Sequence, residues 1–264
     1  MSYRLTLLGT GSSGGVPRVG NHWGACDPTN PKNRRRRCAT LIERISGRGR
    51  TVALIDTPPD IREQLLGTDV EGLDGVLFTH DHADHTHGID DLRMLAFNMK
   101  RRVDVHFDAR TRASLVSRFS YCFASQPGSN YPPILNAHDI HPLRPVTING
   151  AGGPIEALPI PQEHGDIESL GFRIGNVAYS PDISGLPVAS VEHLRGLDLW
   201  IVDALRYIPH PAHWSVKQTL GWIETLKPKR AILTHLHIDL DYATLKRELP
   251  PNVEPAYDGM QVMF

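Results

Sequence analysis

The stretch from Thr79 to His85 constrains this chain more than any other part of its sequence. It reads Thr-His-Asp-His-Ala-Asp-His and therefore places three histidines and two aspartates within seven residues. The apolar segment 75–78 precedes it and predicts a buried strand, and the apolar residues of 89–95 follow at helical spacing. We expect the stretch to form a loop between a strand and a helix, where α/β scaffolds usually carry their chemistry.

The types and spacing of these side chains indicate a metal site. His80 and His82 lie two residues apart, so their side chains share one face of an extended backbone. Asp84 and His85 follow where the chain turns, and they can point at a neighbouring position. Imidazole and carboxylate groups are ligands for zinc, manganese and iron. The arrangement suits two adjacent ions better than one.

Composition limits the class of protein and its partners. The chain has 264 residues, of which 40% are hydrophobic and 22% charged, so we predict a single globular domain over residues 1–264. A net charge of −1 gives no general attraction to nucleic acid or to an anionic membrane. The sequence shows no secretory signal and no membrane-spanning apolar run. Three cysteines form an odd, sparse set, which fits a reducing cytoplasm without a disulfide framework.

Further candidate ligands occur singly at the ends of strands predicted in the second half of the chain. They are His164, Asp182 and His235. Each of them, taken alone, also fits an ordinary loop residue. Asp56 ends the predicted strand 51–55, where it either supports the metal loop from outside or caps the next helix.

The remaining predicted elements alternate along the chain. We expect strands over 5–8, 38–43, 103–107, 155–160, 172–174, 177–179, 199–203 and 230–234, and helices over 109–119 and 215–226. A hairpin turn is predicted at Gly175-Asn176. Residues 121–145 are predicted to form a long surface excursion in which His138 and His141 are exposed.

Two early segments each have two interpretations. The glycine-rich loop Gly9–Pro17 is either a plain connection or a backbone nest for an anion, and it lacks the Lys-Ser/Thr of a P-loop. The run Arg34–Arg37 either grips a phosphate or forms a solvated face, and the solvated face is the commoner case.

The ordered set of ligands resembles the metallo-β-lactamase superfamily. The resemblance rests on an HxHxDH motif after a buried strand, followed by His, Asp and His at later strand ends. It implies an α/β fold, the αβ/βα sandwich of two mixed sheets with outer helices. It also implies a division of the ligands: His80, His82 and His164 on one ion, Asp84, His85 and His235 on the second, and Asp182 bridging both.

Shorter segments narrow the resemblance to PhnP-like phosphodiesterases. These segments are Gly9–Pro17, Arg34–Cys38, His210-Pro-x-His213 and Tyr257–Met260. The resemblance implies two manganese or zinc ions, cyclic ribose phosphates as substrates, and His213 as a general acid or phosphate contact. Arg206 and His210 are further candidate substrate contacts. Of the cysteine cluster that holds a separate structural zinc in that family only Cys26 remains, so we expect no such zinc.

The sequence thus predicts a dinuclear hydrolase in which metal-bound hydroxide attacks a phosphodiester of a cyclic ribose phosphate or a 2′,3′-cyclic nucleotide. Asp84 would bind metal and orient the water, and His213 would protonate the leaving oxygen or bind the phosphate. Alternatives are a tRNA 3′-end endonuclease, a thioester hydrolase and a non-catalytic nucleotide-binding protein. The complete ligand set favours an enzyme. The expected partner is a small phosphodiester or nucleotide, without large nucleic acid or membrane, and a homodimer remains open.

Overall fold

The computed structural model describes residues 2–125 and 127–264, and their contacts divide into two interleaved compact units. Unit 1 comprises the chain up to Thr6 together with Ala39–Glu156 and Gln261–Phe264. Unit 2 comprises Leu7–Cys38 and Ala157–Met260. The single domain over residues 1–264 stays a prediction.

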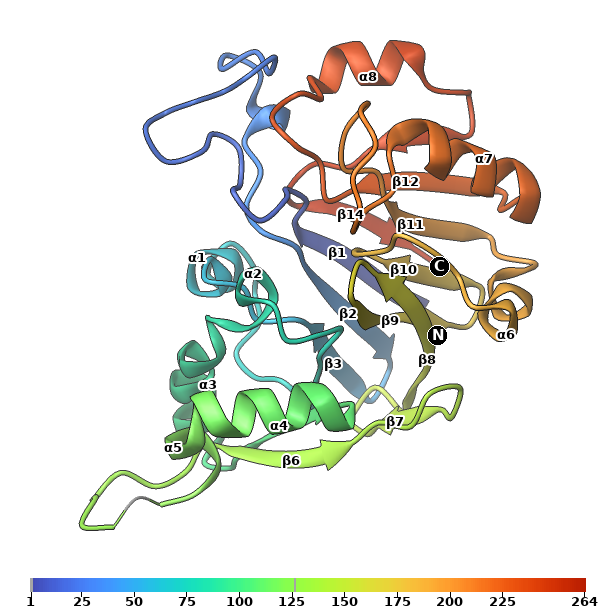
Figure 1. The fold of residues 1–264 in the computed structure, drawn as a ribbon. Helices are drawn as coiled ribbons and strands as arrows, with labels where there is room; N and C mark the ends of the chain where they lie inside the picture. Colours follow the sequence, from blue (N-terminus) through green and yellow to red (C-terminus); the bar gives the residue numbers. More distant parts are fainter. Residues whose placement is uncertain (1, 126) are drawn as a thin grey trace. The chain divides into compact units, whose positions relative to one another are not determined.

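The first sheet has seven strands among the described residues, and its strands from β3 to the edge strand β6 run parallel (Figure 1). Its spatial order is β14 (Met260–Met263), β1 (Ser2–Gly9), β2 (Ala39–Ser46), β3 (Gly49–Ile55), β4 (Gly75–Leu77), β5 (Val103–Phe107) and β6 (Leu135–Asp139). β2 and β3 form an antiparallel hairpin, whereas β3, β4, β5 and β6 pair in parallel. The carboxyl ends of β3 and β4 therefore lie at one edge of the sheet, where the motif loop begins.

Helices of unit 1 follow these strands. They are α1 (Ile61–Leu66), α2 (Ala83–Thr86), α3 (Leu92–Met99), α4 (Ala109–Arg118) and α5 (Ser120–Phe123), with a 3₁₀ turn at Ile89–Asp91. The ring of Phe107 lies 6.1 Å from that of Phe78 and 6.1 Å from that of Phe123, all centroid to centroid, which ties α5 to the sheet. Burying one such phenyl side chain stabilises the fold by about 1.5–3 kcal/mol.

The second sheet also has seven strands within the described part of the chain. Its order is β13 (Val253–Pro255), β12 (Arg230–Thr234), β11 (Leu199–Asp203), β10 (Val177–Ser180), β9 (Ile167–Ile174), β8 (Ile155–His164) and β7 (Val146–Ile148). β10 to β13 run parallel, and β8, β9 and β10 are antiparallel. The predicted hairpin at Gly175-Asn176 is confirmed as the β9–β10 turn.

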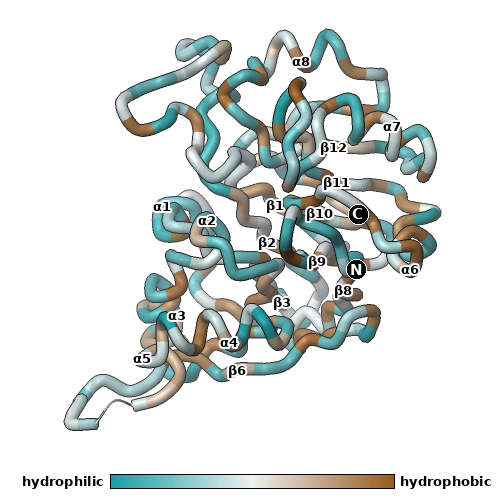
Figure 2. The backbone as a smooth tube through the Cα atoms, in the orientation of Figure 1, coloured by the Kyte–Doolittle hydropathy of each residue, from teal (hydrophilic) through white to brown (hydrophobic). Residues whose placement is uncertain are grey.

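The core of unit 2 is built around two tryptophans. Trp200 of β11 and Trp214 are both buried, and their rings meet edge to face with centroids 6.1 Å apart. α7 (Val216–Leu226) begins beside them at Ser215, whose side chain closes a capping box with Gln218. The unit also contains α6 (Val188–Val191), α8 (Tyr242–Glu248) and 3₁₀ turns at Pro31–Asn33 and Glu192–Leu194. The apolar strands and the polar loops between them can be followed along the tube in Figure 2.

The predicted surface excursion over 121–145 is wrong in part. α5 begins at Ser120, one residue before the predicted excursion, and extends into it to Phe123, and β6 pairs in parallel with β5 from Leu135 to Asp139. β6 was missed because it is an edge strand in which only Leu135 is buried, so it lacks the apolar pattern of a central strand. His138 is exposed, as predicted, and its Nε2 lies 2.9 Å from Oδ1 of Asp104.

The arginine run does not form a solvated face at Arg35. This side chain is 1% exposed, and its guanidinium donates to the carbonyls of His237 and Leu240. Asp258 accepts from the backbone N–H of Arg36 at 2.8 Å and from the hydroxyl of Thr10 at 2.9 Å. The early segments of unit 2 are thus tied to its last ones.

The glycine-rich loop packs against the same arginine segment. The N–H of Gly11 donates to the carbonyl of Arg36, and a Cβ on Gly11 would lie 2.9 Å from that of Arg35. Glycine is required there because the two backbones approach so closely. These contacts agree with the interpretation of Gly9–Pro17 as a plain connection between elements.

Among the described residues, no helix has the length and apolar character needed to cross a membrane.

Candidate metal centre

The motif loop of unit 1 lies where the sequence predicts it. β4 ends at Leu77 and α2 begins at Ala83, so His80 and His82 occupy the connection and Asp84 lies in the first turn of the helix. The ring centroids of His80 and His82 are 4.5 Å apart, which confirms that the two side chains share one face. The ring of His85 is also 4.5 Å from that of His80.

A fully buried carboxylate, Asp56 at the end of β3, organises this loop. It accepts hydrogen bonds from Nδ1 of His85 at 2.7 Å, and from the backbone N–H and the hydroxyl of Thr79, each at 2.8 Å. Burial raises the pKa of Asp56, and the contacts with His85 and Thr79 act in the opposite direction. Of the two interpretations of Asp56, outer support of the loop is confirmed: the next helix, α1, begins after Asp60.

The same network fixes which ring nitrogens face the metal position. The hydroxyl of Thr79 donates to Asp56, so it accepts from Nδ1 of His80, 2.9 Å away. His85 likewise donates from Nδ1 to Asp56. Each neutral ring then carries its lone pair on Nε2, the form that binds a metal ion. Nε2 of His85 lies 3.6 Å from Oδ2 of Asp84, a separation that one shared cation can span.

The loop closes against β3 through a glycine. The N–H of Gly88 donates to the carbonyl of Thr57, whose own N–H donates to the carbonyl of His85. A Cβ on Gly88 would lie 2.1 Å from the carbonyl oxygen of Pro58. Any side chain at Gly88 would therefore push the motif loop away from its support.

In unit 2 the register of parallel strands gathers the ligands. β10, β11 and β12 end beside one another, because Ser180 pairs with Val202 and Asp203 with Thr234. The residues that follow these ends, Asp182 and His235, therefore meet at one edge. His235 has a φ of 58°, a left-handed conformation that turns the chain sharply after β12.

Asp182 is the common neighbour in this second set. Its Oδ2 lies 3.6 Å from Nε2 of His164, 3.6 Å from Nε2 of His235 and 3.9 Å from Nε2 of His213. Nδ1 of His164 donates to the carbonyl of Ala212 at 2.6 Å, which leaves the lone pair on Nε2 in the neutral ring. One carboxylate thus faces three imidazoles within unit 2.

Asp203 is a buried site residue that the sequence interpretation missed. It accepts from Nδ1 of His213 at 2.7 Å and from the N–H of Ile183 at 3.2 Å. It ends the apolar strand β11 and therefore resembles any residue at a strand terminus. Its position at the end of a buried strand, like that of Asp56, was the signal that could have identified it.

The loop between β11 and α7 carries the predicted substrate contacts. His213 is 11% exposed, and its ring stacks on that of His235 with centroids 4.5 Å apart. The guanidinium of Arg206 donates to the carbonyls of Ile208 and Pro209, so it braces this loop. Burial and the nearby charges of His213 and Arg206 lower the pKa of His210. Contact of these residues with substrate stays a prediction.

Cys26 is buried beside two backbone carbonyls and the guanidinium of Arg35. Its thiol donates to the carbonyls of Ile238 and Leu240, and Nη1 of Arg35 lies 3.7 Å from the sulfur. Burial raises the pKa of this thiol, which favours its neutral form. The absence of a structural zinc at this position stays a prediction.

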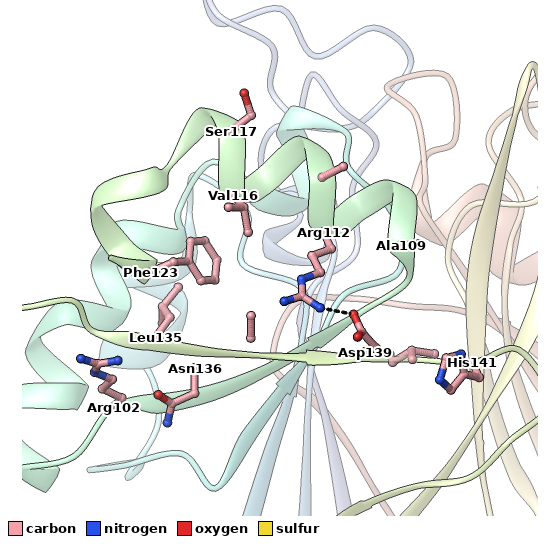
Figure 3. Close-up of a pocket in the computed structure, with 13 residues that line it drawn as sticks. Arg102, Ala109, Arg112, Val116, Ser117, Phe123, Leu135, Asn136, Asp139 and His141 are labelled. Atoms are coloured by element: carbon pink, nitrogen blue, oxygen red, sulfur yellow. Dashed lines mark hydrogen bonds and ion pairs between the residues drawn. The ribbon is translucent and has the colours of Figure 1, made fainter. Parts of the chain in front are cut away.

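A cavity of about 1020 Å³ lies between α4 and β6 in unit 1 (Figure 3). Val116, Phe123 and Leu135 give it an apolar lining, and Arg112 is paired with Asp139 at its edge. It contains none of the predicted site residues.

The donor sets of both units fit a divalent transition metal. Each offers imidazole Nε2 atoms and a carboxylate, and His80, His85 and His164 have a hydrogen-bond partner on Nδ1. That combination of ligand and outer support is characteristic of histidines that bind metal. His80, His82, Asp84 and His85 in unit 1, and His164, Asp182 and His235 in unit 2, are the residues that would hold it.

Comparison with known proteins agrees with this fold and ligand set. The sequence profile of the β-lactamase superfamily domain matches residues 51–236, so the chain belongs to this superfamily. Within it the chain is PhnP-like: a crystal structure described as a new diphosphatase from the PhnP family is 35% identical, with a TM-score of 0.89 over 100% of this chain and 98% of the other. The predicted αβ/βα sandwich is thereby confirmed as the fold class.

Two other similarities bear on function. An octanoyltransferase from Porphyromonas gingivalis (strain ATCC BAA-308 / W83) is 33% identical over 268 residues, which cover 99% of this chain and 51% of that protein. The chain therefore spans about half the length of this curated relative. The short form of human tRNase Z is 16% identical with a TM-score of 0.63, over 98% of each chain, and shows a shared fold.

Proposed function

We propose that this chain is a phosphoric diester hydrolase that uses two divalent ions, manganese or zinc, and acts on a cyclic ribose phosphate or a 2′,3′-cyclic nucleotide. The observation that carries the proposal is the position of Asp182. Its carboxylate lies 3.6 Å from both His164 and His235, which the family resemblance assigns to different ions. A carboxylate shared in this way supports a bridging role and hence two ions.

When bound, such ions lower the pKa of a coordinated water and neutralise charge on the phosphate oxygens. The protein's own contribution is to orient groups around them. Asp56 and Thr79 hold His80 and His85 through their Nδ1 atoms, so the rings cannot turn away from the metal position. Asp84, beside Nε2 of His85, is placed to bind metal and to orient the water.

His213 is the proposed proton donor to the leaving oxygen. Asp203 fixes its ring through Nδ1, which directs Nε2 toward Asp182 and the ligands around it. The carboxylate of Asp203 also stabilises the positive charge that the ring carries when both nitrogens are protonated. A ribose alkoxide is a poor leaving group, so a proton delivered at Nε2 would speed its departure.

A diphosphate is the second candidate substrate. It is favoured by the PhnP-family protein described as a diphosphatase, which matches this chain over its full length. Ions and ligands suited to a phosphodiester would also suit a diphosphate, because both reactions displace an oxygen from phosphorus.

An acyl thioester is the third candidate. It was an alternative on sequence grounds, and the octanoyltransferase relative adds support. The match covers only 51% of the octanoyltransferase, so the activity of that protein can reside outside the matched part.

The deciding experiment is turnover, by the metal-loaded protein, of a panel containing a ribosyl cyclic phosphate, 2′,3′-cyclic nucleotides, bis(p-nitrophenyl) phosphate, a nucleoside diphosphate ester, pre-tRNA, a glutathione thioester and an octanoyl thioester. We expect the cyclic phosphates to have the largest kcat/KM. A larger value for the diphosphate or a thioester would replace the proposed substrate with that class. Retention of a single ion by the fully loaded protein would refute the dinuclear centre.

A further inference from the structure

His82 is held differently from its neighbours in the motif. His80 and His85 are buried and are oriented by the Asp56 network, whereas His82 is exposed. The backbone that carries His82 is held by hydrogen bonds on both sides. The peptide group after His82 is fixed within the loop, because its carbonyl accepts from the hydroxyl of Thr86 at 2.8 Å and from the N–H of His85 at 3.1 Å.

The peptide group before His82 is held by helix α4. Nη2 of Arg118, at the end of that helix, donates to the carbonyl of Asp81 at 2.8 Å and to its carboxylate at 2.8 Å. The hydroxyl of Ser114 donates to the same carboxylate at 2.7 Å, and Nε of Arg118 donates to Ser114 at 3.0 Å. One residue of α4 thus binds both polar groups of Asp81, the residue between the first two motif histidines.

We propose that Arg118 is a positioning residue for His82. By holding the carbonyl of Asp81 it fixes the peptide plane that precedes His82, and Thr86 fixes the plane that follows. A ring whose two flanking peptide planes are fixed has only its side-chain torsions left to order when it binds a metal ion, so part of the entropic cost is removed before binding. The proposal rests on the proposed metal centre and adds a residue outside the HxHxDH motif to its construction.

Two nitrogens of one guanidinium make these contacts, which explains why the residue is an arginine: Nη2 donates to both oxygen acceptors of Asp81, and Nε donates to Ser114. A planar guanidinium donates two or more hydrogen bonds in a fixed geometry, whereas an ammonium acts as a compact charge. The contact is also partly protected: the Arg118 side chain is 37% exposed and that of Asp81 is 16% exposed. An ion pair on a fully solvated surface would contribute too little to fix a backbone.

The same helix supplies a matched control. Arg112 lies in α4, its side chain is 43% exposed, and it pairs with Asp139 of β6 at 2.6 Å (Figure 3). Arg112 resembles Arg118 in charge, exposure and helix, but its partner Asp139 is more exposed than Asp81, and the pair lies at the cavity beside β6 and away from the motif loop. Substitution by methionine keeps the aliphatic stem and the helix in both variants.

The test is the affinity of Arg118→Met and Arg112→Met for Zn²⁺ and Mn²⁺, measured by competition with a chromophoric chelator. Loss of outer support typically weakens metal binding about 10–100-fold, and we expect that loss for Arg118→Met only. Arg118→Lys should give an intermediate affinity. Urea unfolding of the chelator-treated proteins measures any purely structural effect, which we expect to be similar for the two methionine variants.

A double-mutant cycle decides whether the effect acts through His82. In a His82→Ala background, Arg118→Met should cost no further affinity. An equal loss in both backgrounds, or equal affinities of Arg118→Met and Arg112→Met, would overturn the proposal. A wild-type protein that binds two ions but hydrolyses none of the phosphate substrates would instead refute the proposed function and leave the affinity comparison valid. A wild-type protein that binds no ion would refute both.

Discussion

The two units build their ligand sets by different means. In unit 1 the predicted ligands lie close together in the sequence, between His80 and His85, and a single buried carboxylate at the end of the neighbouring strand orients two of them. In unit 2 the ligands come from the ends of three strands, and only the sheet register brings them together. The first set is specified locally by a loop, and the second by the pairing of strands far apart in the sequence.

This difference indicates which substitution should disrupt each ligand set. The unit 1 set depends on a hydrogen-bond network that one substitution at Asp56 can disrupt. The unit 2 set has its shared point at Asp182, which three imidazoles face. Four substitutions test that contrast, in order of decreasing expected effect.

The largest effect is expected for Asp182→Ala. Loss of the shared carboxylate should weaken binding of the second ion, and turnover should fall to the assay background, because a metal ion supplies several kcal/mol of transition-state stabilisation. Metal content by mass spectrometry and steady-state rates measure the two consequences. Normal metal content with a normal rate would place the bridge elsewhere.

His213→Ala is expected to lower the rate about 10²–10⁴-fold on a ribosyl cyclic phosphate, the usual cost of losing a general acid. The loss on bis(p-nitrophenyl) phosphate should be much smaller, because p-nitrophenolate leaves without a proton. Equal losses on both substrates would assign His213 to phosphate binding, which serves either substrate alike. Unchanged rates on both would leave it a structural residue.

Asp56→Asn tests the local network of unit 1. Nδ1 of His85 and the hydroxyl of Thr79 both donate to one oxygen of Asp56, so an amide group there would leave a buried donor unsatisfied. We expect a loss of about 10–100-fold in metal affinity and about 1–3 kcal/mol in the free energy of unfolding.

The control for Asp56→Asn is Asp74→Asn, also in unit 1, whose carboxylate accepts from the N–H of Val52 away from the motif. Its metal affinity should equal that of wild type. If Asp56→Asn binds metal as tightly as this control does, the outer support of the loop is dispensable.

The smallest effect is expected for His138→Ala. Its side chain is 46% exposed; it pairs with Asp104 of β5, and its ring stacks on that of His106 with centroids 4.8 Å apart. We expect unchanged metal content and a change below about 1 kcal/mol in the free energy of unfolding, the range of an exposed ion pair. A measurable loss of metal would show that the ligand set of unit 1 reaches beyond the motif loop.

Sequence patterns predicted the elements whose structure is set locally. The strands 103–107, 199–203 and 230–234 agree with β5, β11 and β12 residue for residue, since each is a short apolar or alternating run. The helix predicted over 215–226 begins one residue later, after its capping residue Ser215. The motif loop was predictable for the same reason, because its ligands are neighbours in the sequence.

Features that depend on distant partners were not predictable. Arg35 looked like part of a solvated run, and its buried position follows from the carbonyls of His237 and Leu240, more than 200 residues away. Asp203 acquires its role only when β10 and β11 align and the loop to His213 folds back. The hydrogen bonds from Arg118 to Asp81 likewise require α4 to lie beside the motif loop.

The contacts of Asp258 have a consequence for folding during synthesis. Its carboxylate satisfies Thr10 and Arg36, which precede it by 248 and 222 residues. At about 5–20 residues per second, the ribosome needs roughly 10–45 s to add the 222 residues that separate Arg36 from its partner. Over that interval the first segments of unit 2 lack the carboxylate that anchors them, whereas Ala39–Glu156 has already emerged. The nascent chain therefore carries Thr10 and Arg36 without this anchor until Asp258 has been added, and a chaperone would have most to protect during that interval.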